Sequence, residues 1–350
     1  MLHFLLLIIL IPTLFAAPLS IQDHWAAISD PILMGQNFES RYYALPTKGE
    51  VIQKNKFWSG DYWALNKGNI NYRWHAMSSF KLKSPTRQEA MSMNQAQLAQ
   101  LSPAEKFDLL NGRYEYPLKS EIEKISDLEA KDWEGICHGW APASMNHQEP
   151  TAKTLLNPDA IAVPFGSSDI KALISHFYAS PYQVADTHQM GQRCSNGRIT
   201  IDVDCQQDLN AGAFHIVLTN MIGLQNEGFI ADLERFKEVW NHPIKAYYVE
   251  VKKDSRGSKI DSAPGTVRTI NLMTTIYYTN GAGNFWETVM DTNRQKMGSL
   301  KLNYVIEVDA YGQIIGGEWK SSERPDFLWK KARPLYFFHP YTRLAELLND

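Results

Sequence analysis

Asp132-Trp-Glu-Gly-Ile-Cys137-His-Gly-Trp-Ala-Pro-Ala-Ser144 is the stretch from which the fold class and the chemistry of this chain are inferred. A loop with Gly135 leads into small residues and Trp that can begin a helix, which places Cys137 at the helix start. The unpaired N–H groups and positive dipole end of a helix N-terminus favour the thiolate, the nucleophilic form of cysteine. A buried structural thiol is the alternative for a single cysteine in this setting.

The composition is that of a large folded chain. Its 350 residues predict one large domain or two, and 44% hydrophobic residues with 12% aromatics are sufficient for a core. The formal net charge of -3 gives no basic surface, which argues against nucleic acid as a partner and against a polybasic membrane anchor. The composition therefore does not indicate the partner, and we expect a monomer.

The N-terminus resembles a secretory signal. Residues 2–15 are almost entirely apolar and end in Phe15-Ala16-Ala17-Pro18, as in the core and small-residue end of a signal peptide. The first segment lacks Lys and Arg, so an uncleaved membrane anchor is the alternative. We expect residues 1–17 to be a signal peptide cleaved near Ala16, and the mature protein to be secreted, extracellular or periplasmic, with no stable membrane anchor.

The three cysteines suggest one disulfide and one free thiol. Cys194 and Cys205 flank a turn at Asn196-Gly197 and an alternating apolar and polar run, which suits a closed local loop. An exported protein pairs such cysteines in an oxidising compartment. The predicted Cys194–Cys205 disulfide leaves Cys137 unpaired, which favours a nucleophile over a core thiol.

Helices are expected mainly before the strands. Residues 18–130 form an aromatic and helical part, in which Ser102-Pro103-Ala104-Glu105 predicts a capped helix start. A second capped helix is predicted over 167–174. Strands are predicted at 214–219, 228–232, 244–251, 267–279, 301–308 and 313–319. The pattern predicts an α+β fold with a five- or six-stranded antiparallel sheet, in one domain spanning 18–350 whose catalytic core lies within 131–350.

A cysteine nucleophile requires an imidazole to accept its proton and a polar group to orient that imidazole. His215 opens one predicted strand and Asp232 ends the next, so a short turn could bring the two together. The predicted catalytic residues are therefore Cys137 as nucleophile, His215 as general base and acid, and Asp232 as the orienting group. Asn241 is the alternative for the third role, and Asp232 is then a turn or cap residue. The backbone N–H of Cys137 is the expected oxyanion donor, and its companion is not identified.

A metal site has weaker support. The run from Asp202 to Asp208 spaces carboxylates at alternate positions, yet it lacks the glycine and closing glutamate of a calcium loop. A solvated acidic turn is the alternative. The sequence contains no paired-cysteine zinc motif, Walker loop or dinucleotide fingerprint.

Several blocks in one order resemble the secreted transglutaminase elicitors, a family first known from oomycetes and with bacterial relatives. The nucleophile segment, the histidine segment and the eliciting peptide of that family are matched by 133–143, 214–220 and 239–244. Further matching blocks lie at 70–74, 102–106, 316–319 and 324–329, so the resemblance covers nearly the whole mature chain. In the eliciting segment, His242 and residues 244–248 depart from the family pattern, which leaves recognition by a host open.

The resemblance implies a papain-like or transglutaminase-like Cys-His-Asp centre. Such a centre forms a thioester with a glutamine side chain, releases ammonia and passes the acyl group to a lysine amine of a protein. No cofactor is required by this chemistry, although calcium dependence is attributed to oomycete members. Two alternatives remain: a cysteine protease or glutamine deamidase that gives the acyl group to water, and a non-catalytic elicitor or binding protein whose surface is an exposed segment around Trp240.

Overall fold

A computed structural model of this chain describes residues 25–78, 82–180, 186–193, 209–233, 238–259 and 261–349. The predicted signal peptide, the predicted Cys194–Cys205 disulfide and the acidic run at 202–208 lie outside these residues. Within the described ranges, no helix has the length and apolar character needed to cross a bilayer.

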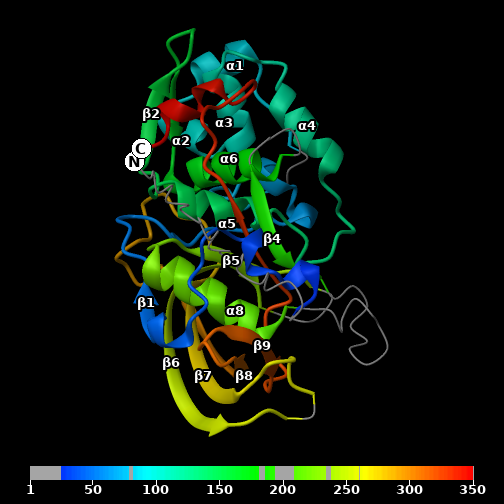
Figure 1. Ribbon diagram of the computed structural model, residues 1–350. Coiled ribbons are helices and arrows are strands. Elements are labelled where there is room, and N and C mark those ends of the chain that lie inside the picture. The colour runs from blue at the N-terminus through cyan, green and yellow to red at the C-terminus, as the bar shows by residue number, and fades with distance from the viewer. Residues whose placement is uncertain are drawn as a thin grey trace, which may run out of the picture.

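The molecule has a helical half and a sheet half, which meet near the centre of Figure 1. The helices are Arg87–Ser92 (α1), Gln95–Ala99 (α2), Pro103–Leu110 (α3), Pro117–Ile125 (α4), Cys137–Asn146 (α5), Ser167–Ala179 (α6) and Ala211–Leu218 (α8). The strands are Lys48–Glu50 (β1), Lys153–Leu156 (β2), Ala162–Phe165 (β3), Thr187–Gly191 (β4), Phe229–Asp232 (β5), Asn241–Arg256 (β6), Arg268–Thr279 (β7), Met297–Val308 (β8), Ile314–Trp319 (β9) and Phe327–Lys331 (β10).

The main sheet is antiparallel. In the described residues it has eight strands, in which β4, β10, β5, β6, β7, β8 and β9 follow one another and β1 pairs with β6. A separate pair joins β2 to β3. The α+β prediction is confirmed, but the predicted five or six strands omitted β1, β4 and β10.

The helix starts follow the capping signals of the sequence. Ser102 caps α3, since its hydroxyl accepts from the Glu105 N–H while the Glu105 carboxylate accepts from the Ser102 N–H. The predicted helix at 167–174 is α6, in which the Asp169 carboxylate accepts from the Gly166 N–H at 2.8 Å. Both predictions are confirmed.

The segment predicted as a strand at 214–219 is helix α8, so this prediction is wrong. Asn210 caps the helix by accepting from the N–H groups of Gly212 and Ala213. A continuous apolar run fits a fully buried helix as well as a buried strand, because periodicity does not separate the two. Gly212 lets α8 lie against β9, since a Cβ there would come within 2.2 Å of the Gly316 carbonyl oxygen.

Two hydrophobic cores fill the two halves. One core surrounds α3, α5 and α6 and includes Cys137 and Trp329. The other lies between α8 and the sheet and includes Phe214 and Tyr304. Figure 1 shows α5 where the two halves meet and α8 across the sheet. The nucleophile candidate therefore lies at the junction of the two halves.

Candidate active site

Cys137 is the first residue of α5, as the sequence predicted. The preceding backbone is fixed against another loop, because the Ile136 N–H donates to the Tyr62 carbonyl oxygen at 2.6 Å. Gly135 permits this approach, since a Cβ there would lie 2.4 Å from the same oxygen. Close packing of α5 on α6 depends on Gly139, whose Cβ would lie 2.0 Å from the Ser175 carbonyl oxygen. Two glycines thus set the position of the thiol.

The thiol of Cys137 is free and buried, and it lies against Val239 and against Asn241, the first residue of β6. The side-chain nitrogen of Asn241 donates to Sγ at 3.3 Å, and Sγ is 3.7 Å from the Val239 carbonyl oxygen, which accepts the thiol hydrogen. Burial raises the pKa of Cys137 above its ordinary value, although the side-chain and backbone N–H groups of Asn241 favour the thiolate. The thiol in this conformation is therefore neutral and hydrogen-bonded.

The orientation of the Asn241 amide follows from its other neighbour. The Trp329 indole N–H donates to Oδ1 of Asn241 at 2.8 Å. Indole is a donor only, so the atom facing Trp329 must be the amide oxygen and the atom facing Cys137 must be the nitrogen. The amide therefore presents N–H groups to the sulfur.

Asp232 lies beside the same site. It is the last residue of β5, pairs in register with Asn241 and is fully buried. Its Oδ1 accepts from the backbone N–H of Trp240 at 3.2 Å. The charge of Asp232 raises the pKa of Cys137 further, so this carboxylate does not stabilise the thiolate. The structure brings Cys137, Asp232 and Asn241 together.

His215 is not part of this group. It lies on α8, where its Nδ1 is 2.8 Å from the Tyr304 hydroxyl, which is 2.7 Å from the Thr274 hydroxyl. Burial lowers the pKa of His215 to about 3. The imidazole is thus a neutral member of a buried hydrogen-bonded network in the second core.

The strand register shows how many residues of β6 separate the level of Tyr304, the partner of His215, from Asn241, the partner of Cys137. Tyr304 pairs with Leu272 of β7, and Leu272 pairs with Val251 of β6. Val251 lies about ten residues along β6 from Asn241, or roughly 30 Å of strand at about 3.3 Å per residue. The structure therefore does not bring His215 to Cys137, because the helix that stands in place of the predicted strand carries the ring to the other core.

No imidazole within the described ranges hydrogen-bonds the Cys137 sulfur. His138 follows Cys137 in the chain and is exposed. His242 is next to Asn241, but its ring packs on Tyr278 with centroids 4.7 Å apart, on the opposite face of the strand. The site is thus a cysteine with amide donors and a nearby carboxylate.

The rim of the site is aromatic. Tyr62 and Trp240 meet edge to face with ring centroids 5.4 Å apart, and the Trp240 indole donates to Glu238 at 3.1 Å. Trp240 is only partly exposed, so the exposed recognition segment expected around it is a half-buried rim instead. Beside it lies an open pocket of about 480 Å³, lined by Ala130, Lys131, Asp132, Trp133 and Glu238.

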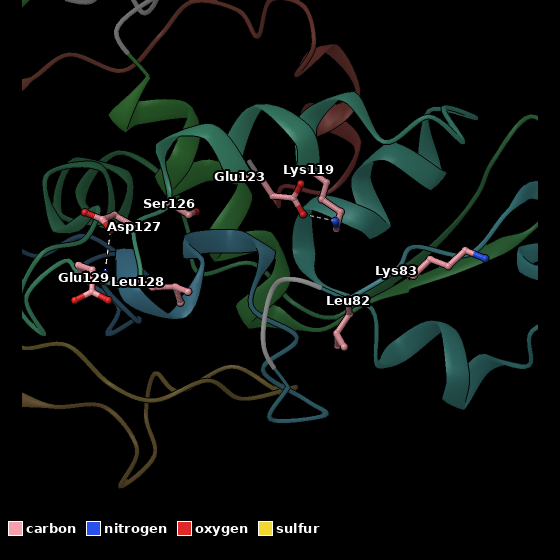
Figure 2. A pocket seen from close by; sticks show the side chains of 8 residues that line it. All are labelled: Leu82, Lys83, Lys119, Glu123, Ser126, Asp127, Leu128 and Glu129. Carbon is pink, nitrogen blue, oxygen red and sulfur yellow. Dashed lines mark hydrogen bonds and ion pairs between the residues drawn. The ribbon is translucent and has the colours of Figure 1, made fainter.

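A second open pocket, of about 760 Å³, lies on the helical half (Figure 2). It is lined by Leu82, Lys83, Lys119, Glu123, Ser126, Asp127, Leu128 and Glu129. Its Lys119 and Glu123 form an ion pair one helical turn apart, as the dashed line in Figure 2 shows. Its lining includes neither Cys137 nor Asn241.

The family model for the transglutaminase elicitors matches residues 123–336, more than half of the chain. This chain belongs to the transglutaminase elicitor family. Its structure is similar to the crystal structure of the GP42 transglutaminase from Phytophthora sojae, with a TM-score of 0.67, 21% sequence identity, and coverage of 90% of this chain and 94% of that chain. At this identity the likeness shows the fold alone. No curated protein matches the sequence.

The family prediction from the sequence is thus confirmed, and the chain is a transglutaminase-related protein with a mixed α+β fold. Sequence reasoning missed Trp329, whose indole orients Asn241 from a strand that the pattern did not predict. Trp329 is the last residue of the block at 324–329 that resembles the family, and this block was the sequence signal that could have identified it. Tyr62 was also missed, since its carbonyl acts through the backbone and leaves no residue pattern.

Proposed function

We propose that this member of the transglutaminase elicitor family is an exported protein-glutamine γ-glutamyltransferase with Cys137 as its nucleophile. The observation that carries the proposal is the buried free thiol at the start of α5, with an amide nitrogen 3.3 Å from the sulfur. Family membership supports the reaction class, and the formal net charge of -3 argues against nucleic acid as the substrate.

The reaction begins with acylation. Sγ of Cys137 bonds to the side-chain carbonyl carbon of a substrate glutamine, and the C=O electrons move to the oxygen. The tetrahedral species then expels the nitrogen, which leaves as ammonia with the proton of the thiol, and a thioester remains. A lysine amine attacks this thioester, the C–S bond breaks, and a proton of the amine returns to the sulfur.

Asp232 is proposed as a positioning residue. Its carboxylate holds the Trp240 N–H, and its strand pairs with Asn241, so it fixes the chain that faces the thiol. We do not propose that Asp232 orients His215, because His215 lies in the other core. The proposal assigns no histidine as the base.

Calcium enters only through the resemblance to oomycete members. In the described ranges, no three His, Cys, Asp or Glu side chains are grouped so as to hold a metal ion, and the acidic run at 202–208 lies outside those ranges. Calcium is therefore given no role here, and the steps above involve only the chain and its substrates.

The test measures incorporation of a labelled primary amine into a glutamine-bearing protein. We expect incorporation by the wild type and its loss in Cys137→Ala. Ser144→Ala is the matched control, because Ser144 is buried on the same helix and its hydroxyl bonds only the Ala141 carbonyl within α5. Incorporation by Cys137→Ala equal to that of the wild type would contradict the proposal.

Product masses separate the alternative acceptors. Amine gain with loss of ammonia indicates transfer to a lysine-type acceptor, whereas a deamidated side chain or a cut backbone indicates water as the acceptor.

Export is tested separately, by the N-terminal sequence of the protein recovered outside the cytoplasm. A mature chain that starts near Ala17 is expected, and retention of residues 1–17 would contradict cleavage.

A further inference from the structure

We propose that Asn241 is a catalytic residue whose side-chain N–H groups hold the negative charge that develops during acyl transfer. The charge lies first on Cys137 Sγ and then on the oxygen of the substrate carboxamide. This inference rests on the proposed function and deepens it, because it supplies the oxyanion donor that the sequence left unidentified.

The first support is the direction of the amide. Because the Trp329 indole can only donate, it fixes Oδ1 of Asn241 toward itself and leaves both N–H groups of Nδ2 on the side of the sulfur. One N–H reaches Sγ at 3.3 Å in the resting thiol. The second N–H is available to the substrate oxygen, which is carried by the carbon that bonds to this sulfur.

The second support is rigidity. Asn241 begins β6 and pairs with Asp232 of β5, while the next residue toward the N-terminus, Trp240, is held by the Asp232 carboxylate. Its side chain is held from the other end by β10, which also pairs with β5. Donors that are fixed before the reaction stabilise developing charge without reorganisation, which is the main source of oxyanion stabilisation.

The third support is the low polarity of the site. Cys137 and Asn241 are 6% and 5% exposed, and Trp329 and Trp140 belong to the apolar core around the thiol. Electrostatic interactions are stronger where water is excluded. Two opposing effects act on the pKa of Cys137: burial raises it, and the N–H groups of Asn241 lower it.

The chemistry assigns Asn241 a role in both halves of the reaction. As the thiol proton passes to the nitrogen of the substrate carboxamide, Nδ2 of Asn241 donates to the sulfur anion. As the S–C bond forms, the C=O electron pair of the carboxamide moves to its oxygen, and Nδ2 of Asn241 donates to that oxygen. Collapse of the tetrahedral species restores the C=O bond and releases ammonia. Attack of the amine on the thioester repeats the oxyanion, and Asn241 serves it again.

The experiment compares Asn241→Ala, Asn241→Asp and Trp329→Phe in the full-length secreted protein. Asn241→Asp is nearly isosteric and still accepts from the indole, but it replaces the donor at the sulfur by an acceptor. Trp329→Phe leaves Asn241 intact and frees its amide to rotate. Asn293→Asp is the control, because it makes the same change from amide to carboxylate at an exposed residue in the loop between β7 and β8.

Two readouts are used: the pH dependence of Cys137 alkylation by iodoacetamide, mapped by peptide mass, and the rate constant for amine incorporation. We expect Asn241→Ala and Asn241→Asp to slow alkylation at neutral pH about tenfold or more. Loss of the Asn241 donor raises the pKa of Cys137, and a rise of about one pH unit lowers the thiolate fraction about tenfold. Amine incorporation should fall by about 100-fold, as for loss of one oxyanion donor. Both rates for Trp329→Phe should lie between those of the Asn241 variants and wild type, and both rates for Asn293→Asp should match wild type.

Alkylation and amine incorporation within about twofold of wild type in Asn241→Ala would overturn the inference. If Asn241→Asp fails to fold, Asn241→Ala and Trp329→Phe still decide. Failure of the proposed function looks different: the wild type would incorporate no amine, while the alkylation rates would still report whether Asn241 holds the sulfur anion.

Discussion

His215 illustrates what a single buried residue does in this molecule. Its Nδ1 bonds the Tyr304 hydroxyl, which in turn bonds Thr274, so the ring links α8 to β8 and β7. A buried polar network of this kind stabilises one arrangement of the core only when each member is paired. The network explains the histidine without any role in proton transfer.

We predict that His215→Asn lowers the free energy of unfolding by about 1–3 kcal/mol, because the Tyr304 hydroxyl loses a buried partner. Alkylation of Cys137 in the folded variant should proceed as in the wild type, because the ring lies in the other core. Chemical denaturation and alkylation kinetics check the two parts. A changed pH dependence of alkylation would restore His215 as a candidate base.

Glycine at 139 is needed for the position of the nucleophile helix. A Cβ at Gly139 would lie 2.0 Å from the Ser175 carbonyl oxygen, so α5 must move away from α6 in Gly139→Ala. We predict destabilisation by about 1–3 kcal/mol, typical of overpacking, together with slower alkylation of Cys137. Gly283→Ala is the control, since a Cβ there meets nothing within 4 Å. Equal stabilities of the two variants would contradict this packing.

At the scale of elements, helix α6 is anchored by two buried ion pairs. Lys106 of α3 donates to Asp169 at 2.7 Å, and Lys171 donates to Glu149 at 2.5 Å. Glu149 also accepts from the backbone N–H groups of Val289 and Met290, in the loop between β7 and β8. The helical half and the sheet half are thus joined by charged groups that are almost fully buried.

We predict that Asp169→Asn destabilises the fold by about 3–5 kcal/mol, because Lys106 is left as a buried unpaired charge. Burial already lowers the pKa of Lys106. Glu250→Gln is the matched control, since its pair with Lys252 has side chains 40% and 47% exposed and should contribute less than about 1 kcal/mol. Thermal and urea unfolding compare the two, and a similar small loss in both would show that Asp169 is dispensable.

For the whole molecule, buried histidines make stability depend on pH. Burial lowers the pKa of His215 to about 3 and that of His176 to about 4. Between these values and about 6.5, the unfolded chain binds protons that the folded chain does not, so these two groups reduce stability as pH falls. Asp108 acts in the opposite direction, because burial raises its pKa to about 7 and the folded state keeps that proton.

We predict that His215→Asn has a shallower loss of stability than wild type below about pH 6.5. The difference in slope should be about 1.4 kcal/mol per pH unit, the value for one proton. Urea unfolding at a series of pH values between about 4 and 7 measures it. Parallel curves for the two proteins would show that His215 is not buried in its neutral form.

The sequence was most informative where local signals agree with the tertiary structure. Capping residues located the start of α3, alternation located β8, and the small residues after Gly135 placed Cys137 at a helix start. It failed where tertiary packing decides. The apolar run around His215 has no period that separates helix from strand, and β4 is polar and exposed along most of its length.

The site was predictable in part for the same reason. The sequence named Asp232 and Asn241 as alternatives for one role, whereas the structure pairs them in register between β5 and β6. Trp329 reaches Asn241 from a strand far along the chain, and no local pattern carries that contact. The family blocks included the segments of Cys137 and His215, but they did not show that the two residues lie in different cores.

The most direct test of the central claim is a mass measurement on the protein after brief reaction with a glutamine peptide and acid quenching. A thioester predicts a new species whose mass is that of the protein plus the peptide less ammonia, with the adduct on the peptide that contains Cys137. The species should disappear on addition of a primary amine and should be absent from Cys137→Ala. Turnover of the peptide with no adduct on Cys137, or the same adduct in Cys137→Ala, would contradict the account.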